Sequence, residues 1–469
     1  MQLKSAIKQL ELLQYMVENL ELYSGVALRV LWESPWLRDA EALAAQTALL
    51  QSYYAAQADA NTLPHRELLQ IKLSGIRDIK GSLKRLQDGS TPDDVEWFEI
   101  KSFALLSQEI GKLLPACGLT QLTLPCLEKL VRLLDPEGQS VPSFYVYDAY
   151  SIELAELRKK YEREGEEMDA EARQALFEKM ARIEARVREM LAEKARPFVP
   201  DALNALHEIA SIDIGFAKAK QMQQWGLTLP QMTDGQTAYK GLFHPQIAAR
   251  LAGEGRAFQP IDIAFGPSPT LITGSNMGGK TVVLQMIATS QCLFQFGFAV
   301  PAQTAQIAAV DSVALSLLRK NEMHKGLSSY ASEVVQINEI IKDIRKGRQL
   351  LAVFDEPVQT TNPTEGAALV NALLAFLVQE QVRAVLTTHY SGISGAFSRL
   401  RVKGFSEEAL TESLSAHNIE KYMNYSLVPV SESAQAPREA LRVAALLGVD
   451  AEWLALSRAQ LEPDPKEIP

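Results

Sequence analysis

The octapeptide GSNMGGKT at residues 274–281 constrains the fold more than any other feature, because it has the form G-x-x-x-x-G-K-T of a P-loop. It follows an apolar run and precedes a helical pattern, VVLQMIATSQCLFQ, as the motif requires. In such a loop, backbone N–H groups wrap phosphates at a helix N-terminus, the lysine reaches the outer phosphates and the hydroxyl holds Mg²⁺. An ordinary glycine-rich turn with a surface lysine is the structural alternative. The full motif favours a site for ATP and Mg²⁺ that comprises Gly274, Gly278, Gly279, Lys280 and Thr281.

Two later apolar runs end in polar residues that suit the same site. QLLAVFDEP (residues 349–357) ends in Asp355 and Glu356, and AVLTTHY (384–390) ends in His389. At strand tips beside a P-loop, Asp355 would hold Mg²⁺ through water and Glu356 would orient or deprotonate the attacking water. A histidine there would contact the γ-phosphate and report its loss. Taken alone, the two acids would indicate a solvated turn and the histidine a structural role. The series of P-loop, acid pair and histidine instead predicts an ATPase with three catalytic residues: Lys280, Glu356 and His389.

The periodicity of apolar residues divides the chain into a helical part and an α/β part. Spacings of three and four predict helices up to about residue 134, and residues 135–148 predict a loop with a short strand. Nearly balanced charges over 151–195 are typical of two solvated helices of about twenty residues each, which form an arm. Beyond residue 225, short apolar runs alternate with helical stretches, which predicts a mostly parallel sheet. We expect an α plus α/β fold with helical domain 1–150, arm 151–200, return helix 201–225, P-loop domain 226–435 and a C-terminal helical segment with a disordered tail, 436–469.

Composition limits the possible partners. The net charge of −10 disfavours a large generic nucleic-acid footprint, although it leaves room for a local basic groove. No run of eighteen apolar residues exists and the first residues lack the apolar region of a signal peptide, so we expect a cytoplasmic protein without membrane association. The three cysteines and six histidines show no zinc-ligand spacing, so any metal should arrive with the nucleotide.

These motifs together resemble the MutS family of DNA mismatch repair ATPases. GSNMGGKT is similar to the family's G-P-N-M-G-G-K-S, SSYASEV (328–334) to its S-T-F-x-x-E signature helix, and TTHY (387–390) to its T-H-Y/F switch. GFAVPAQ (297–303) and FQPIDIAF (258–265) also look like family segments. The resemblance implies that Phe258 stacks on adenine and that Asn276 assists the nucleotide site. It further implies a homo- or heterodimer in which Ser328 and Glu333 act in trans on the partner's ATP.

The resemblance extends to the helices, where YDAYSIELAELR and ASIDIGFAKA look like the family's lever and clamp. It therefore implies a lever and clamp bundle followed by an ABC/MutS-type ATPase domain. Ahead of those helices we expect neither a mismatch-recognition domain nor a connector, which would make this a short member. The segment PVQTTNPTEG (357–366) replaces the family's G-R-G-T-S-T after the acids and leaves the communication between paired ATP sites open.

Two functions follow from this resemblance, and the residues alone do not decide between them. In the first, ATP closes a dimer on a DNA structure without mismatch reading. Phosphate ligands would then come from a basic helix face, whose simpler interpretation is a solvated surface: Arg77, Lys80, Lys84 and Arg85. In the second, the protein is a remodeller that reactivates a cobalamin-dependent aminomutase, which the acidity and the short arm favour. An inactive nucleotide-binding scaffold is a third possibility that the intact site residues oppose.

Overall fold

The computed structural model describes residues 1–141, 143–274, 278–316, 329–405, 423–431, 441, 444–445 and 448–460. Contacts divide the chain into two units. One unit comprises Leu20–Ser34 and Ala48–Gln223, and the other comprises Met1–Asn19, Pro35–Thr47 and Gln224–Pro469. No helix among these described residues is long and apolar enough to cross a membrane.

The first unit is helical. Its helices are α3 (Ala27–Glu33), α5 (Leu63–Ser74), α6 (Lys80–Gln87), α7 (Asp94–Leu113), α8 (Glu128–Leu134), α9 (Ile152–Glu164), α10 (Ala170–Ala195) and most of α11 (Val199–Trp225), with 3-10 turns at Ala60–Thr62, Asp148–Tyr150 and Arg196–Phe198. The helix α4 (Ala40–Ala58) runs from the other unit into this one. Asp93 begins α7 with a capping box, because its side chain accepts from the Glu96 amide while the Glu96 side chain accepts from the Asp93 amide.

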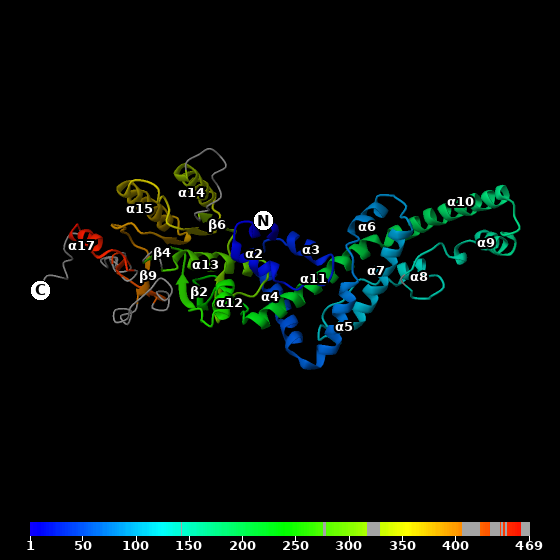
Figure 1. The fold of residues 1–469 in the computed structure, drawn as a ribbon, viewed down its shortest axis with the longest axis horizontal. Helices are drawn as coiled ribbons and strands as arrows, with labels where there is room; N and C mark the ends of the chain where they lie inside the picture. The colour runs from blue at the N-terminus through cyan, green and yellow to red at the C-terminus, as the bar shows by residue number, and fades with distance from the viewer. Residues whose placement is uncertain are drawn as a thin grey trace. The chain divides into compact units, whose positions relative to one another are not determined.

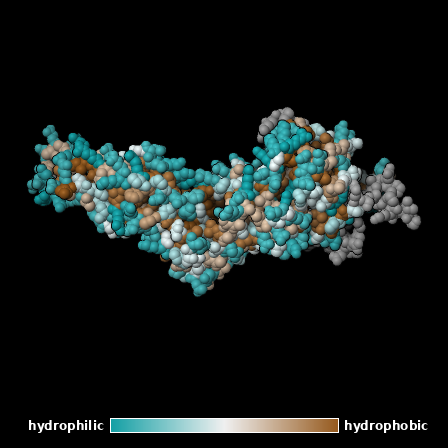
Figure 2. Space-filling view, turned by 180° about the vertical axis from the view of Figure 1, so that it is seen from behind, coloured by the Kyte–Doolittle hydropathy of each residue, from teal (hydrophilic) through white to brown (hydrophobic). Residues whose placement is uncertain are grey.

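The arm consists of α9 and α10, which Figure 1 shows side by side and which contact each other. The two-helix prediction is confirmed, but the helices have 13 and 26 residues rather than about twenty each. One stripe of α10 is buried, at Leu176, Met180, Ile183, Val187 and Leu191. Figure 2 shows a mostly hydrophilic surface with a few apolar patches over this pair. The predicted short strand within 135–148 is wrong for the residues that the structure describes there, which form a loop.

The second unit is built around two sheets. The four-stranded sheet has the order β1 (Gln231–Thr233), β5 (Thr304–Ala308), β2 (Thr237–Leu242), β3 (Ile261–Phe265). The six-stranded sheet has the order β10 (Met423–Pro429), β9 (Ser398–Phe405), β4 (Pro269–Thr273), β8 (Arg383–Thr387), β7 (Leu350–Phe354), β6 (Ser312–Ser316). All neighbours in the second sheet are parallel except β10, which is antiparallel to β9. The prediction of a mostly parallel sheet is confirmed for this six-stranded sheet.

Helices cover both faces of the six-stranded sheet, which explains why β7 is buried at every residue. Alternate side chains of β7 and β8 pack in a core with α14 (Ser329–Arg345) and α15 (Pro363–Gln379). The helix α13 (Lys280–Gln295) contacts the same strands, and Figure 1 shows it below the sheet with α14 and α15 above. The part of this unit that the structure describes also contains α1 (Leu3–Ile7), α2 (Glu11–Glu18), α12 (Pro245–Gly253) and α17 (Ala451–Ala459). This layering places the ends of β4, β7 and β8 together.

The first residues do not group with the helical domain that was predicted for 1–150. Contacts place Met1–Asn19 and Pro35–Thr47 with the α/β unit. The helix α2 buries Leu12, Leu13, Met16 and Val17, and it contacts α12 and α13. The apolar spacing of α2 predicts that one face is buried, but it cannot specify which element covers that face.

Candidate functional site

The loop between β4 and α13 has the backbone geometry that its glycines permit. Gly274 has φ +141° and Gly279, which precedes α13, has φ +69°, conformations that other residues rarely adopt. A Cβ on Gly274 would also lie 3.1 Å from the Cβ of Val402, so space as well as conformation favours glycine. Asn276 lies outside the described residues. The described part of the loop leads directly into the N-terminus of α13, where backbone N–H groups and the helix dipole attract anions.

Lys280 is buried between the loop and the strand tips. Its side chain is 4% exposed, and its Nζ donates to the Gly274 carbonyl at 2.8 Å and lies 3.0 Å from Oε1 of Glu356. The ammonium is therefore fixed beside the loop by two oxygen atoms, one of which carries charge. This position suits a cation that binds phosphate at the mouth of the loop.

Asp355 is held by two threonine hydroxyls. Oγ1 of Thr281 donates to Oδ2 at 2.7 Å, and Oγ1 of Thr387 donates to Oδ1 at 2.8 Å. The Thr387 hydroxyl also accepts from the Glu356 amide at 2.9 Å. A carboxylate beside a hydroxyl is the oxygen-rich arrangement in which Mg²⁺ is held through its waters. Thr387 was missed by the sequence analysis, although it stands in the TTHY motif.

The carboxylate of Glu356 lies between the side chains of Lys280 and His389. Its Oε1 is 3.0 Å from Lys280, as given above, and Oε2 is 3.5 Å from Nδ1 of His389, whose side chain is 39% exposed. The structure therefore brings together Lys280, Thr281, Asp355, Glu356 and His389, which come from three segments far apart in the sequence. Ser328 lies outside the described residues. Glu333 makes a hydrogen bond within the same chain, because its Oε1 accepts from the Val358 amide at 3.0 Å.

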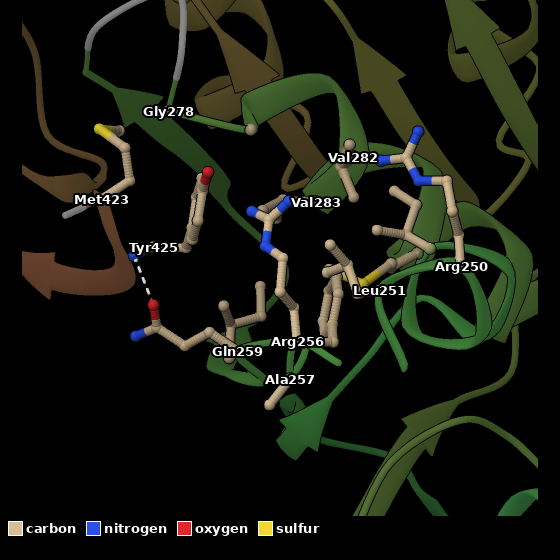
Figure 3. Close-up of a pocket in the computed structure, with 15 residues that line it drawn as sticks. Arg250, Leu251, Arg256, Ala257, Gln259, Gly278, Val282, Val283, Met423 and Tyr425 are labelled. Atoms are coloured by element: carbon tan, nitrogen blue, oxygen red, sulfur yellow. Dashed lines mark hydrogen bonds between the residues drawn. The ribbon is translucent and has the colours of Figure 1, made fainter. Parts of the chain in front are cut away.

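A pocket of about 600 Å³ adjoins this cluster. It is lined by Phe258, by Gly278 and Gly279 of the loop, and by Tyr425 of β10. Gln259 fixes β10 here, because its Oε1 accepts from the Tyr425 amide at 3.0 Å, which Figure 3 marks as a dashed line. Figure 3 also shows Arg256 extending between Tyr425 and Val283. An aromatic-lined pocket beside a phosphate loop suits a flat nucleobase.

Tyr425 and Arg256 were missed as site residues. Tyr425 lies in β10, within the stretch YSLVPV at residues 425–430. Tyr425 comes close to the loop only because β10 pairs with β9. A Cβ atom added to Gly279 would lie 3.4 Å from the ring of Tyr425. No local pattern signals that pairing.

His244 caps the helix α12, which lines the pocket through Ile247 and Leu251. Its Nδ1 accepts from the Ile247 amide at 3.3 Å, so the cap needs the neutral imidazole. Burial lowers the pKa of His244 to about 4, well below the ordinary value of about 6.5.

We expect this histidine to make stability depend on pH. Because the folded pKa is depressed, the contribution of the neutral cap is complete above about pH 6.5 and decreases as the pH falls towards 4. The unfolding free energy of His244→Asn, which keeps a capping acceptor that does not titrate, should be less sensitive to pH. Between pH 7.5 and 5 the difference between wild type and variant should change by about 1–2 kcal/mol in denaturant titrations. Parallel pH profiles for the two proteins would contradict this role of His244.

The basic residues that were proposed as phosphate ligands are mostly paired with acids. Nη1 of Arg77 lies 3.2 Å from Glu99, Nζ of Lys80 lies 3.4 Å from Glu33, and Arg85 pairs with Glu96. Lys84 is exposed. Each of the three pairs partly neutralises the positive field that would attract a phosphate backbone. DNA contact through this face would require these side chains to exchange partners.

Comparison with known proteins connects these observations to a family. Residues 270–461 match the family model of MutS domain V. The chain is 30% identical over 252 residues to the Endonuclease MutS2 of Bacillus velezensis, 29% over 307 residues to that of Halalkalibacterium halodurans and 33% over 211 residues to that of Geobacillus sp.. These alignments cover 53%, 64% and 44% of this chain but 31%, 37% and 26% of the relatives. The chain thus spans less than two fifths of the length of these relatives.

The parallel sheet, the strand–loop–helix and the matching model together define an α/β domain of the type that is the ATPase domain of MutS proteins. Residues 270–461 thus match MutS domain V, and the chain is similar to MutS-type proteins over the aligned part of its length.

Proposed function

We propose that this protein is a MutS-family ATPase that binds ATP with Mg²⁺, hydrolyses it and uses the cycle to close a dimer on a DNA structure, without reading mismatches. The observation that carries the proposal is the convergence of Lys280, Asp355 and Glu356 at the loop before α13. MutS-type relatives and the domain V match support an activity on DNA. The term endonuclease in the relatives' name describes those longer proteins.

Each site residue has a role that its environment supports. Lys280 and the N-terminus of α13 would bind the β- and γ-phosphates, as a buried cation and a helix dipole favour. Thr281 and Asp355, already joined by a hydrogen bond, would hold Mg²⁺, which would supply positive charge against the charge that develops on the phosphates. Glu356 would orient the attacking water, with His389 near its other oxygen.

The pocket beside the loop would bind the base. Phe258 and Tyr425 offer aromatic surfaces, and the pocket volume of about 600 Å³ lies in the range of small-molecule sites. Figure 3 shows Arg256 directed into this space, where a guanidinium could stack on a base or pair with phosphate oxygens. The predicted roles of Asn276 and of Ser328 in trans remain part of the proposal.

The test of the proposal is the ATPase rate with and without duplex, branched and single-stranded DNA at two salt concentrations. Phosphate contacts release counterions, so stimulation by DNA should decline as salt rises. We expect the branched or duplex DNA to raise turnover several-fold at low salt. Rates that do not respond to any DNA would contradict the DNA role and direct the search to a protein client. Turnover that persists in Glu356→Gln would contradict the assignment of the catalytic carboxylate.

A further inference from the structure

The backbone of Val358, in the segment that follows Asp355 and Glu356, is held on both sides by side chains. Its N–H donates to Oε1 of Glu333 in α14 at 3.0 Å, and its carbonyl accepts from the hydroxyl of Tyr390 at 2.8 Å. Val358 and Glu333 are both buried, with 4% and 9% exposure. Two elements that are remote in sequence, the helix α14 and the residue after His389, therefore hold the two peptide groups that flank the Cα of Val358.

The backbone of this segment is in a conformation that residues other than glycine rarely adopt. Val358 has φ +57° and Glu356 has φ +46°, in the left-handed region. A β-branched residue rarely adopts that region, because its Cβ approaches backbone atoms. Such a conformation persists only when the surroundings impose it, and it occurs preferentially at functional sites. The side chains of Glu333, as acceptor, and Tyr390, as donor, hold Val358 in this conformation, together with the Thr361 amide, which donates to the Val358 carbonyl at 3.4 Å.

Gly366 in α15 leaves the space that Tyr390 occupies. A Cβ at position 366 would overlap the Tyr390 hydroxyl and the ring carbon that bears it. Residues 357–366, which depart from the family pattern, thus provide both the held peptide and the gap for the side chain that holds it. Burial raises the pKa of Tyr390, with the nearby Glu333 acting in the same direction, so the hydroxyl retains its proton and can donate.

We propose that Glu333 and Tyr390 are positioning residues that clamp Val358 and thereby set the Glu356 carboxylate beside Lys280 and His389. Glu356 lies two residues before Val358, so a relaxed backbone at 358 displaces it. The clamp also connects α14 to Glu356 within one subunit, so that movement of α14 changes turnover. This inference rests on the proposed ATP hydrolysis.

Two substitutions and one matched control test the clamp through the ATPase reaction. Tyr390→Phe removes only the hydroxyl, and Gly366→Ala displaces it. Both should lower kcat about five- to tenfold, the effect of one lost hydrogen bond to a strained backbone, while KM for ATP stays within twofold. Tyr150→Phe is the matched control, because the Tyr150 hydroxyl also donates to a backbone carbonyl, that of Leu133, in the helical unit. It should leave kcat unchanged.

Two substitutions of Glu333 distinguish a positioning role within the subunit from a role of its charge at the ATP site of a partner subunit. Glu333→Gln keeps an oxygen that accepts from the Val358 amide, whereas Glu333→Ala does not. Positioning predicts nearly wild-type kcat for the glutamine variant and a decrease like that of Tyr390→Phe for the alanine variant. Equal loss in both variants would overturn the clamp in favour of a charge that acts elsewhere. Burial raises the pKa of Glu333, although the bond from Val358 opposes this, so a neutral amide fits the same environment.

Hydrogen exchange gives a readout that does not need ATP turnover. The peptide that contains Val358 should exchange faster in Tyr390→Phe and Glu333→Ala than in wild type and Tyr150→Phe. Unchanged exchange would overturn the clamp whether or not the protein hydrolyses ATP. If these variants exchange faster at Val358 but keep the wild-type kcat, the proposal that the clamp positions Glu356 would be overturned. Absence of turnover in the wild type would contradict the proposed function alone, and the exchange data would still decide the clamp.

Discussion

Lys280→Met should reduce the affinity for ATP with Mg²⁺ about a hundredfold, because it removes a buried cation that binds phosphate through charge-assisted hydrogen bonds. Methionine is preferable to alanine here, since Lys280 is 4% exposed and a truncated side chain would leave a cavity. Methionine also keeps most of the buried chain length. Isothermal titration calorimetry of the full chain would measure the affinity.

The control for this prediction is Lys342→Met, an equivalent change on the surface of α14. Lys342 is 54% exposed and its Nζ lies 2.7 Å from Glu339, in an exposed ion pair that contributes little to the stability of the fold. ATP affinity in this variant should equal that of the wild type. Equal affinity in Lys280→Met as well would mean that the loop before α13 does not bind the nucleotide phosphates, provided that circular dichroism shows a folded variant.

Local patterns predicted the parts of the site that depend on single segments. The apolar runs before Gly274, Asp355 and His389 became β4, β7 and β8, because buried parallel strands need continuous apolar residues whatever their neighbours are. Their order in the sheet then places the polar residues at one edge. To predict that these polar residues lie together, it was therefore enough to recognise the three strands and the P-loop.

Contacts that arise from strand pairing and packing could not be predicted in this way. Tyr425 reaches the pocket because β10 pairs with β9, and the Val358 peptide is held by residues from two other elements. Neither feature leaves a periodic signal in the sequence. The unequal helices of the arm have the same origin, since α10 continues along a buried stripe that contacts both α8 and α9. Charge patterning showed that the arm is solvated but not where each helix ends.

The helical unit contains a buried ion pair whose loss should have the largest effect on stability. Nζ of Lys101 lies 3.0 Å from Oδ1 of Asp135 and donates to the Tyr147 hydroxyl at 2.7 Å, and the charged side chains are at most 1% exposed. Burial alone would raise the pKa of Asp135, but hydrogen bonds from the Ser140 amide and from Lys101 outweigh it and hold that pKa below its ordinary value. The carboxyl group of Asp135 is therefore ionised at neutral pH, and its contact with Lys101 ties α7 to the loop that leads to the arm.

Asp135→Ala should destabilise the helical unit by about 3–5 kcal/mol, because it leaves the Lys101 ammonium buried without its counter-charge. Denaturant unfolding followed by far-ultraviolet circular dichroism would measure the loss, with ATP affinity as a check that the α/β unit remains folded. The double variant Lys101→Met with Asp135→Ala removes both charges and should recover a large part of the loss. A double variant as unstable as Asp135→Ala would show that the hydrogen bond from Ser140, rather than the uncompensated charge, determines the cost. An unchanged midpoint in the single variant would contradict the pair's contribution altogether.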